Sequence, residues 1–193
     1  DGTGNVSGGR GNLELLSTGI SSDSETALGV GGDAGDITVD AKNISVLGGA
    51  VIASRSIGSA GHAGSIKITA TDSLSLSGTQ LLNTAPIREI RPSSISTESE
   101  PEGTRLAQGA GGRITIQAGT LSINKGATVS ASTAAGDSSK VPANITIAAQ
   151  AITLSNGGTI TANTTGNAPA GNIGLATQQL TMTPDSAITS NAQ

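Results

Sequence analysis

The sequence predicts an all-β protein, a parallel β-helix (β-solenoid) in which each repeat forms one coil. Three observations indicate this fold. An Ile-x-Ile pair, a Leu-x-Leu pair and one further aliphatic residue recur along nearly the whole chain. Successive copies begin 29, 48, 31 and 28 residues apart, and no segment shows a sustained helical period. We therefore expect a single domain over 1–193, with about five to six coils of three short strands each.

The copy at 35–54 shows how one coil is built. Ile37 and Val39 alternate with outward residues, Ile44 and Val46 do the same, and Ile52 follows alone. A period of two is typical of β-strands, and the Gly and polar residues between the pairs mark bends. Strands this short, joined by one- or two-residue bends, fit a coil better than a series of hairpins. A polar, Gly-rich loop then leads to the next copy.

Stacking such coils about 4.8 Å apart places equivalent residues in columns. The first strands begin at Ile37, Ile66, Ile114, Ile145 and Ile173. The second strands begin at Leu13, Ile44, Leu74, Leu121, Ile152 and Leu180. The third strands centre on Ile20, Ile52, Leu82, Val129, Ile160 and Ile188. The outward column of the second strand is Glu14, Ser45, Ser75, Ser122, Thr153 and Thr181. Asn12 and Asn43 are expected to stack at the bend before this strand.

The 48-residue interval predicts a long extrahelical insertion in the third coil. The segment 85–105 holds three of the six prolines and seven charged residues, which do not suit a stacked ladder. One interpretation is a recognition loop on a rigid scaffold, and the other is a tolerated surface insertion. The candidate recognition residues are Arg88, Glu89, Arg91, Glu98, Glu100, Glu102 and Arg105.

Composition narrows the function classes. The chain has no Phe, Tyr or Trp and a single Met, so its core must be built from Ile, Leu, Val and Ala. A net charge of -4 without a basic run argues against a nucleic-acid partner. The absence of cysteine excludes disulfides and thiolate metal sites. No apolar run is long enough for a membrane span and no signal peptide opens the chain, so an exported protein would contain this chain as a mature segment or internal fragment.

The motif Ala-Gly-[Asn/Asp/Ser]-Ile-x-[Ile/Val/Leu] at Ala34–Val39, Ala63–Ile68 and Ala170–Leu175 resembles the repeat region of filamentous-haemagglutinin-like exoproteins, especially cyanobacterial ones. This resemblance implies a right-handed β-helix exported by two-partner secretion and displayed or released as an adhesin. It places the chain outside the cell or on the outer surface of a Gram-negative-type bacterium. The secretion-domain motif containing Asn-Pro-Asn does not occur, so a role as the secretion domain is not expected.

The favoured function is a structural or adhesive surface protein without catalytic activity, either a rod or a fibre segment. The alternative is a polysaccharide-active enzyme or a carbohydrate-binding module on the same fold. A glycosidase needs two carboxylates facing one groove, whereas Glu14, Asp40 and Asp72 are scattered or lie at bends and no Asp-x-Asp pair occurs. An ice-binding face is a remote alternative, because the hydroxyl column is single and mixes Ser with Thr.

Metal binding has one candidate. The run 29–39 differs by one residue from the repeat-in-toxin calcium pattern, with Ala34 where Gly is expected, which makes Asp33 and Asp36 candidate calcium ligands. That motif binds calcium between consecutive copies, and only one copy is present. The single histidine, His62, lies in a loop without a His or Cys partner and is interpreted as a solvated residue. No cofactor is expected.

The two ends, 1–11 and 186–193, contain no amphipathic helix or charged cap. Open strand edges on the first and last coils recruit other strands. We therefore expect either flanking coils of a longer chain or end-to-end stacking of identical subunits into a filament. Contact with a host cell, a neighbouring cell or a polysaccharide is the remaining expected partnership.

Overall fold

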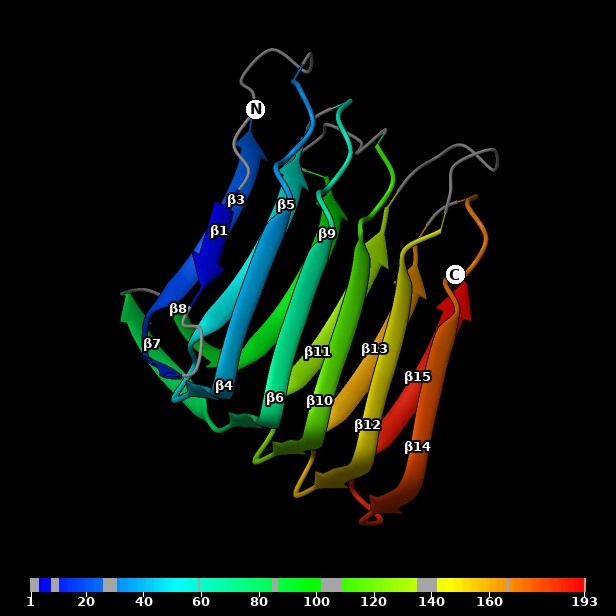
Figure 1. The fold of residues 1–193 in the computed structure, drawn as a ribbon. Coiled ribbons are helices and arrows are strands. Elements are labelled where there is room, and N and C mark those ends of the chain that lie inside the picture. Colours follow the sequence, from blue (N-terminus) through cyan, green and yellow to red (C-terminus); the bar gives the residue numbers. More distant parts are fainter. Residues whose placement is uncertain are drawn as a thin grey trace.

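The computed structural model describes residues 4–7, 11–25, 31–58, 60–84, 87–101, 109–134, 142–165 and 167–192. All the regular elements in these ranges are strands, and they form two parallel sheets and one hairpin. The front sheet of Figure 1 contains β1 (Gly4–Ser7), β2 (Asn12–Leu16), β4 (Ile37–Leu47), β6 (Ile66–Ser77), β10 (Arg113–Asn124), β12 (Asn144–Ser155) and β14 (Ile173–Met182). The back sheet contains β3 (Gly19–Glu25), β5 (Val51–Ile57), β9 (Ser94–Glu100), β11 (Thr128–Thr133), β13 (Thr159–Thr164) and β15 (Ala187–Ala192). The antiparallel hairpin joins β7 (Thr79–Thr84) to β8 (Ile87–Pro92).

The strands follow one another as the coils of a β-solenoid, which confirms the predicted fold class. Coil 1 is β1 to β3, coil 2 is β4 and β5, and coil 3 is β6 to β9. Coil 4 is β10 and β11, coil 5 is β12 and β13, and coil 6 is β14 and β15. In Figure 1 the front strands run downward and the back strands run upward while the chain advances from left to right. The coil is therefore right-handed.

The first and second strands expected in coils 2 to 6 form one continuous strand in each, which bends at a corner and stays paired with the strands of neighbouring coils on both sides of the bend. In Figure 1 the lower ends of β4, β6, β10, β12 and β14 turn sharply, yet each remains one continuous strand. A register shift takes up the difference in length between coils, because Ala41 pairs with Ala70 while Asn43 pairs with Ser73. At this corner the Asn43 side-chain amide donates to the Asn12 side-chain oxygen at 2.9 Å, which confirms the predicted amide stack.

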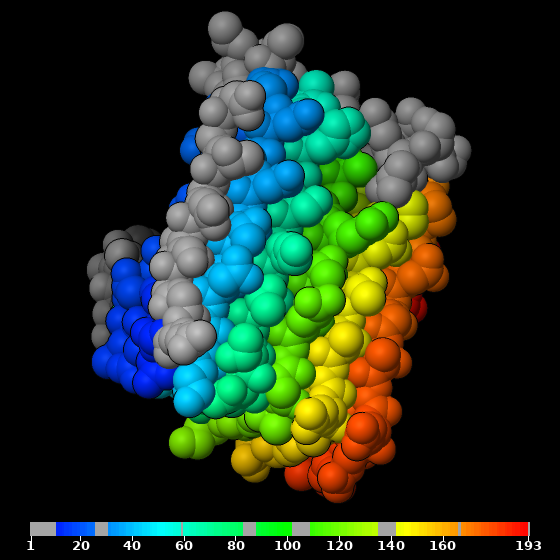
Figure 2. Space-filling model, viewed as in Figure 1, coloured from blue at the N-terminus to red at the C-terminus, as the bar shows by residue number. Residues whose placement is uncertain are grey.

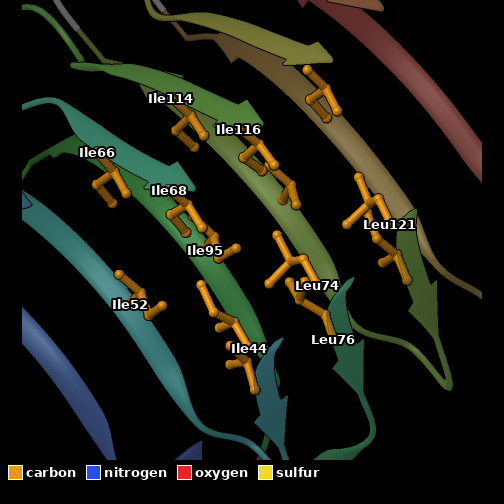
Figure 3. Packing of buried hydrophobic residues seen from close by; sticks show 14 of the residues in the cluster. Ile44, Ile52, Ile66, Ile68, Leu74, Leu76, Ile95, Ile114, Ile116 and Leu121 are labelled. Atoms are coloured by element: carbon orange, nitrogen blue, oxygen red, sulfur yellow. The ribbon is translucent and has the colours of Figure 1, made fainter. Parts of the chain in front are cut away.

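The inward columns of the front sheet agree with the prediction. Ile66 pairs in register with both Ile37 and Ile114, and Leu74 pairs with both Ile44 and Leu121. Each of these side chains is at most 1% exposed. Figure 3 shows such residues meeting across the narrow space between the two sheets, level by level. The interior repeats the same small volume in every coil, so aliphatic side chains fill it without aromatic rings.

One residue of the predicted back-sheet column was wrong. Ile95, not Leu82, pairs in register with Ile52 and Val129, and Ile95 is 0% exposed. Leu82 lies in the hairpin, where it pairs with Glu89. The chain leaves the coil at Thr79 rather than at residue 85 and returns at Ser94, so the predicted boundaries of the insertion were wrong on both sides.

The inner side of the back sheet also carries hydroxyls that hold the Gly-rich loops. The Ser56 hydroxyl donates to the Gly61 carbonyl oxygen at 2.6 Å, and Ser99 does the same to Gly109 at 2.7 Å. In coil 4 the Gly111 amide donates to the Thr133 hydroxyl oxygen at 2.9 Å. These bonds satisfy loop backbone groups that would otherwise be buried without partners. They fix each loop as it returns from the back sheet to the front sheet.

Glycine is required in these loops because successive coils approach closely. A Cβ on Gly64 would lie 2.3 Å from the Gly35 carbonyl oxygen, and one on Gly112 would lie 2.0 Å from that of Gly64. The obstacle is backbone in both cases, so it cannot rotate away. The Gly of the repeated Ala-Gly motif therefore allows neighbouring coils to approach this closely.

Candidate functional site

The hairpin β7–β8 lies against the outward face of the back sheet and encloses a groove of about 460 Å³. Its walls are Glu89, Arg91 and Pro92 from β8, and its floor is formed by outward residues of three neighbouring strands. The floor residues are Val51, Ala53 and Arg55 of β5, Ser94, Ser96, Glu98 and Glu100 of β9, and Thr128 and Ser130 of β11. The volume falls in the range of about 300–1,000 Å³ that small-molecule sites occupy. The front sheet carries a shallower hollow of about 400 Å³ with a mainly alanine lining on β10, β12 and β14, and Figure 2 shows the outer surface of this sheet as bands of side chains that follow the coils.

Two hydrogen bonds anchor the base of the hairpin to the solenoid. Ser93, which is 0% exposed, accepts a hydrogen bond from the Gly49 amide at 3.0 Å and donates one to the Ser77 carbonyl oxygen at 2.8 Å. A Cβ on Gly49 would lie 2.4 Å from the Cβ of Gln80. The hairpin therefore packs directly on the turn of the preceding coil, which holds it over the groove.

An ion pair forms the N-terminal side of the groove. Asp23, Arg55 and Glu98 stand level with one another on β3, β5 and β9. The Arg55 guanidinium donates from Nε and Nη2 to the two Asp23 carboxylate oxygens, at 3.2 and 2.7 Å. This bidentate hydrogen bond is the main reason why the pKa of Arg55 is raised above its ordinary value.

Two carboxyl groups share the floor of the groove. Glu98 and Glu100 are two residues apart on β9, so both project from the outward face. Burial raises the pKa of Glu98 from 4.5 to about 8, and the hydrogen bond to Glu100 and the charge of Glu100 add to this effect. Arg55 acts in the opposite direction. Glu98 is therefore mainly a protonated hydrogen-bond donor at neutral pH.

The two faces of the hairpin differ, because the inner face carries an aligned polar pair and the outer face carries an exposed apolar pair. Arg91 pairs in register with Gln80 and donates from Nη2 to the Gln80 side-chain oxygen at 2.8 Å. The Arg91 Nε is buried, and among the described residues it has no hydrogen-bond partner. Leu81 and Ile90 also pair across the hairpin and are 47% and 66% exposed.

The predicted recognition residues divide into three groups. Glu89, Arg91, Glu98 and Glu100 meet at the groove, although they belong to two different elements. Arg88 is exposed on β8 and does not line the groove. Glu102 and Arg105 lie outside the described residues. Asp23 and Arg55 were not predicted as site residues. Each lies three residues after a residue of the aligned back-sheet column, Ile20 or Ile52, so the sequence already implied that they stand level.

The candidate calcium ligands hold neighbouring coils together instead. The Asp33 carboxylate accepts a hydrogen bond from the His62 amide at 2.7 Å, and Asp36 accepts one from the Ser65 amide at 2.6 Å. His62 continues this pattern, because its Nδ1 accepts a hydrogen bond from the Ala110 amide at 2.9 Å. It is therefore a contact between coils as well as an exposed residue. Within the described ranges no group of three or more His, Cys, Asp or Glu side chains is arranged to hold a metal ion.

The outward acids that were considered for catalysis lie away from the groove. Glu14 is exposed on β2, and Asp72 pairs with Lys42 at 3.4 Å, with both side chains half exposed. An exposed pair of this kind contributes little to stability.

The described part of the chain contains no helix long and apolar enough to cross a membrane. Comparison of the chain with protein-family models, curated proteins and solved structures found no match.

Proposed function

We propose that this chain is a non-catalytic segment of an extracellular or cell-surface β-solenoid, which serves as a rigid rod and contacts other surfaces through the groove and its hairpin. The observation that carries the proposal is the contrast between coil 3 and its neighbours. The other described coils join their front and back strands by short connections, and coil 3 alone among them inserts a hairpin that covers its outer face. Polar and charged side chains gather at this one place.

The resemblance to filamentous-haemagglutinin-like exoproteins supports the same proposal. Those proteins are exported by two-partner secretion and act as adhesins, and their repeats are built on a motif that this chain carries at Ala34–Val39. We extend to this chain an extracellular or outer-surface location and an adhesive role. Contact with a host cell, a neighbouring cell or a polysaccharide is the corresponding partnership.

The Glu98–Glu100 pair bears on catalysis, which is the competing function. Retaining glycosidases hold their two carboxyl groups about 5 Å apart and inverting enzymes hold them further apart. Glu98 and Glu100 project side by side from the same strand, instead of flanking a ligand from opposite sides as the two carboxyl groups of a glycosidase do. The pair therefore favours binding over glycoside hydrolysis.

The end coils support association along the axis. Within the described part of the chain β14 pairs with β12 alone, and its Leu180 and Met182 are 44% and 40% exposed. An open edge of this kind accepts a further strand. We propose that such edges join further coils, either of a longer chain or of a second copy.

Leu180→Lys should reduce sedimentation of large species at high concentration, whereas Ile90→Lys, a matched change on the hairpin, should not. Equal behaviour of the two variants would argue against edge pairing.

Removal of the hairpin tests the adhesive role. Register places Ser77 level with Leu47 and Ser94 level with Val51. Three residues join Leu47 to Val51, so replacement of 79–92 by a single glycine gives coil 3 a connection of equal length. The inserted glycine stands level with a residue whose φ is +79°, a backbone conformation that favours glycine.

Beads coated with the wild-type protein should bind to cells of the source organism, and beads coated with the hairpin-less variant should bind at least about fivefold less, a loss of about 1 kcal/mol. Far-ultraviolet circular dichroism confirms that the variant keeps its β-structure. Wild-type beads that bind no better than uncoated beads would refute the adhesive proposal.

A further inference from the structure

The groove has a mixed lining of small, hydroxyl-bearing and charged side chains. Val51, Ala53 and Pro92 give it short apolar surfaces, and hydroxyls come from residues such as Ser96 and Ser130. Ser96 is only 6% exposed because the hairpin lies over the sheet at this point. Small floor residues leave the space that larger side chains would fill. A lining of this kind combines shape with a few directed polar groups, as binding sites for small molecules do.

The charges that line the groove are balanced. Arg55 and Arg91 provide two positive charges, and Glu89 and Glu100 provide two negative charges, while Glu98 is mainly protonated below its pKa of about 8. Asp23, on the neighbouring strand β3, already accepts a hydrogen bond from the Arg55 guanidinium and offsets part of its positive charge. A strongly anionic or cationic ligand would therefore meet like charges as well as opposite ones. The lining suits an uncharged ligand.

One donor and several acceptors at the groove have spare hydrogen-bonding capacity. The Arg91 Nε is buried and lacks an acceptor among the described residues, which carries a free-energy cost until an acceptor arrives. The protonated Glu98 carboxyl donates its one proton to the Glu100 carboxylate beside it, and the remaining oxygen lone pairs of both groups can accept hydrogen bonds. A ligand with many hydroxyl groups both donates and accepts, so it matches these groups without adding charge.

We propose that the groove between the hairpin and strands β5, β9 and β11 binds a short segment of an uncharged, hydroxyl-rich glycan. This inference rests on the proposed adhesive role and specifies the chemistry of the contact. Arg91 and the Glu98–Glu100 pair direct the hydrogen bonds to the sugar hydroxyls, and the small residues of the floor give the sugar ring its space.

The test uses the full chain and defined oligosaccharides. Cellohexaose, maltohexaose, xylohexaose and mannohexaose are the neutral probes, and a heparin-derived hexasaccharide is the charged comparison. Isothermal titration calorimetry and saturation-transfer NMR measure binding. At least one neutral probe should bind in the micromolar to millimolar range, more tightly than the charged one. Binding of the charged probe alone, or of no probe, would overturn the proposal.

Two substitutions at equivalent positions locate the site. Ser130→Leu fills the floor of the groove on β11 and should raise the dissociation constant at least about tenfold. Thr161→Leu makes a similar change at the residue level with Ser130 on β13, outside the groove, and should change it less than about twofold. Arg91→Met keeps an unbranched apolar stem, removes the donors of the side chain and should also weaken binding. Equal behaviour of the two leucine variants would refute the assignment.

The pH dependence gives a separate readout. The charged and titratable groups around Glu98 are Asp23, Arg55, Glu100 and, on the hairpin, Glu89 and Arg91. Deprotonation of Glu98 breaks its hydrogen bond to Glu100 and places two negative charges side by side, which disturbs the acceptors that face the ligand, so binding should weaken between pH 7 and pH 9. Glu98→Gln should abolish this dependence.

The outcomes separate this inference from the adhesive role on which it rests. Wild-type beads that bind cells, with Ser130→Leu beads binding equally well, would leave adhesion standing and refute the glycan groove. The exposed Leu81 and Ile90 of the hairpin would then be the contact surface. Wild-type beads that fail to bind cells would refute the adhesive role, whatever the oligosaccharides do.

Discussion

Substitution of Ile95 by alanine should destabilise the protein strongly, because this residue fills the back-sheet column of coil 3. Ile95 is 0% exposed and stands between Ile52 and Val129. Removal of three carbon groups costs roughly 2.4 kcal/mol at about 0.8 kcal/mol each. The cavity left between two fixed coils adds to this, so the total loss should be about 3–4 kcal/mol. Ile90→Ala is the matched control, since Ile90 is 66% exposed and its truncation should cost roughly 0.8 kcal/mol or less.

Urea unfolding followed by far-ultraviolet circular dichroism measures these losses. The chain has no Trp or Tyr, so tryptophan fluorescence cannot report on it. Coils couple to their neighbours, and a loss in coil 3 should therefore lower the midpoint of the whole described solenoid. Leu82→Ala provides the decisive comparison, because Leu82 is the residue that the regular spacing would place in the column. If Leu82→Ala destabilises the protein as much as Ile95→Ala does, the assignment of Ile95 to the column is refuted.

Three further predictions concern the contacts between coils and the acidic pair. The pKa of Glu98 is higher in the folded protein than in the unfolded chain, so its stabilisation is complete below about pH 4.5 and is lost as the pH rises through about 8. Wild-type stability should therefore fall between pH 5 and pH 9 relative to Glu98→Gln in thermal melts, and parallel curves would contradict this. Gly64→Ala should cost about 1–3 kcal/mol in urea unfolding, because the new Cβ meets the Gly35 backbone. Gly32→Ala, where a Cβ meets no atom within 4 Å, should be close to neutral, and equal losses would disprove the stacking argument. Asp33→Asn keeps an acceptor for the next coil and should leave the melting temperature unchanged with or without millimolar calcium, whereas a rise with calcium in the wild type alone would restore the calcium hypothesis.

The regular aliphatic spacing was enough to predict the front sheet. In a solenoid one strand pairs with its counterpart in the next coil, so a residue such as Ile66 is placed by its position in the repeat. The same reasoning failed at Leu82, which lies eight residues after Leu74 just as Ile52 lies eight residues after Ile44. Spacing along the chain cannot distinguish a strand that stays in the coil from one that leaves it as a hairpin.

A second sequence pattern identifies the true strand. Ile52 is followed at the second and fourth positions by Ser54 and Ser56, and Ile95 is followed in the same way by Thr97 and Ser99. These four hydroxyls are buried against the Gly-rich loops. Leu82 has Pro86 at its fourth position, which cannot supply such a hydroxyl. The pattern acquires meaning only once the structure shows that the hydroxyls hold the loop backbone.

The sequence predicted some residues of the groove but not the groove itself, because spacing along the chain does not reveal the hairpin. Charge density identified Glu89, Arg91, Glu98 and Glu100, but their meeting depends on the hairpin folding back over β9. The raised pKa of Glu98 arises from this covering. The ladder from Asp33 to His62 was likewise missed, because a carboxylate that accepts a bond from the next coil and one that binds a metal look alike in sequence.

The direction of the backbone ladder determines how such a rod would respond to force. Each strand lies across the long axis, so the hydrogen bonds between strands, and side-chain bonds such as that from Asn43 to Asn12, point along the axis. Tension along the axis is shared by all the bonds of one coil boundary, and every boundary carries the same tension because the boundaries lie in series. The rod would therefore hold its length until one boundary parts, instead of stretching gradually. The two pieces would expose complementary strand edges that match in register and can rejoin when the load is released.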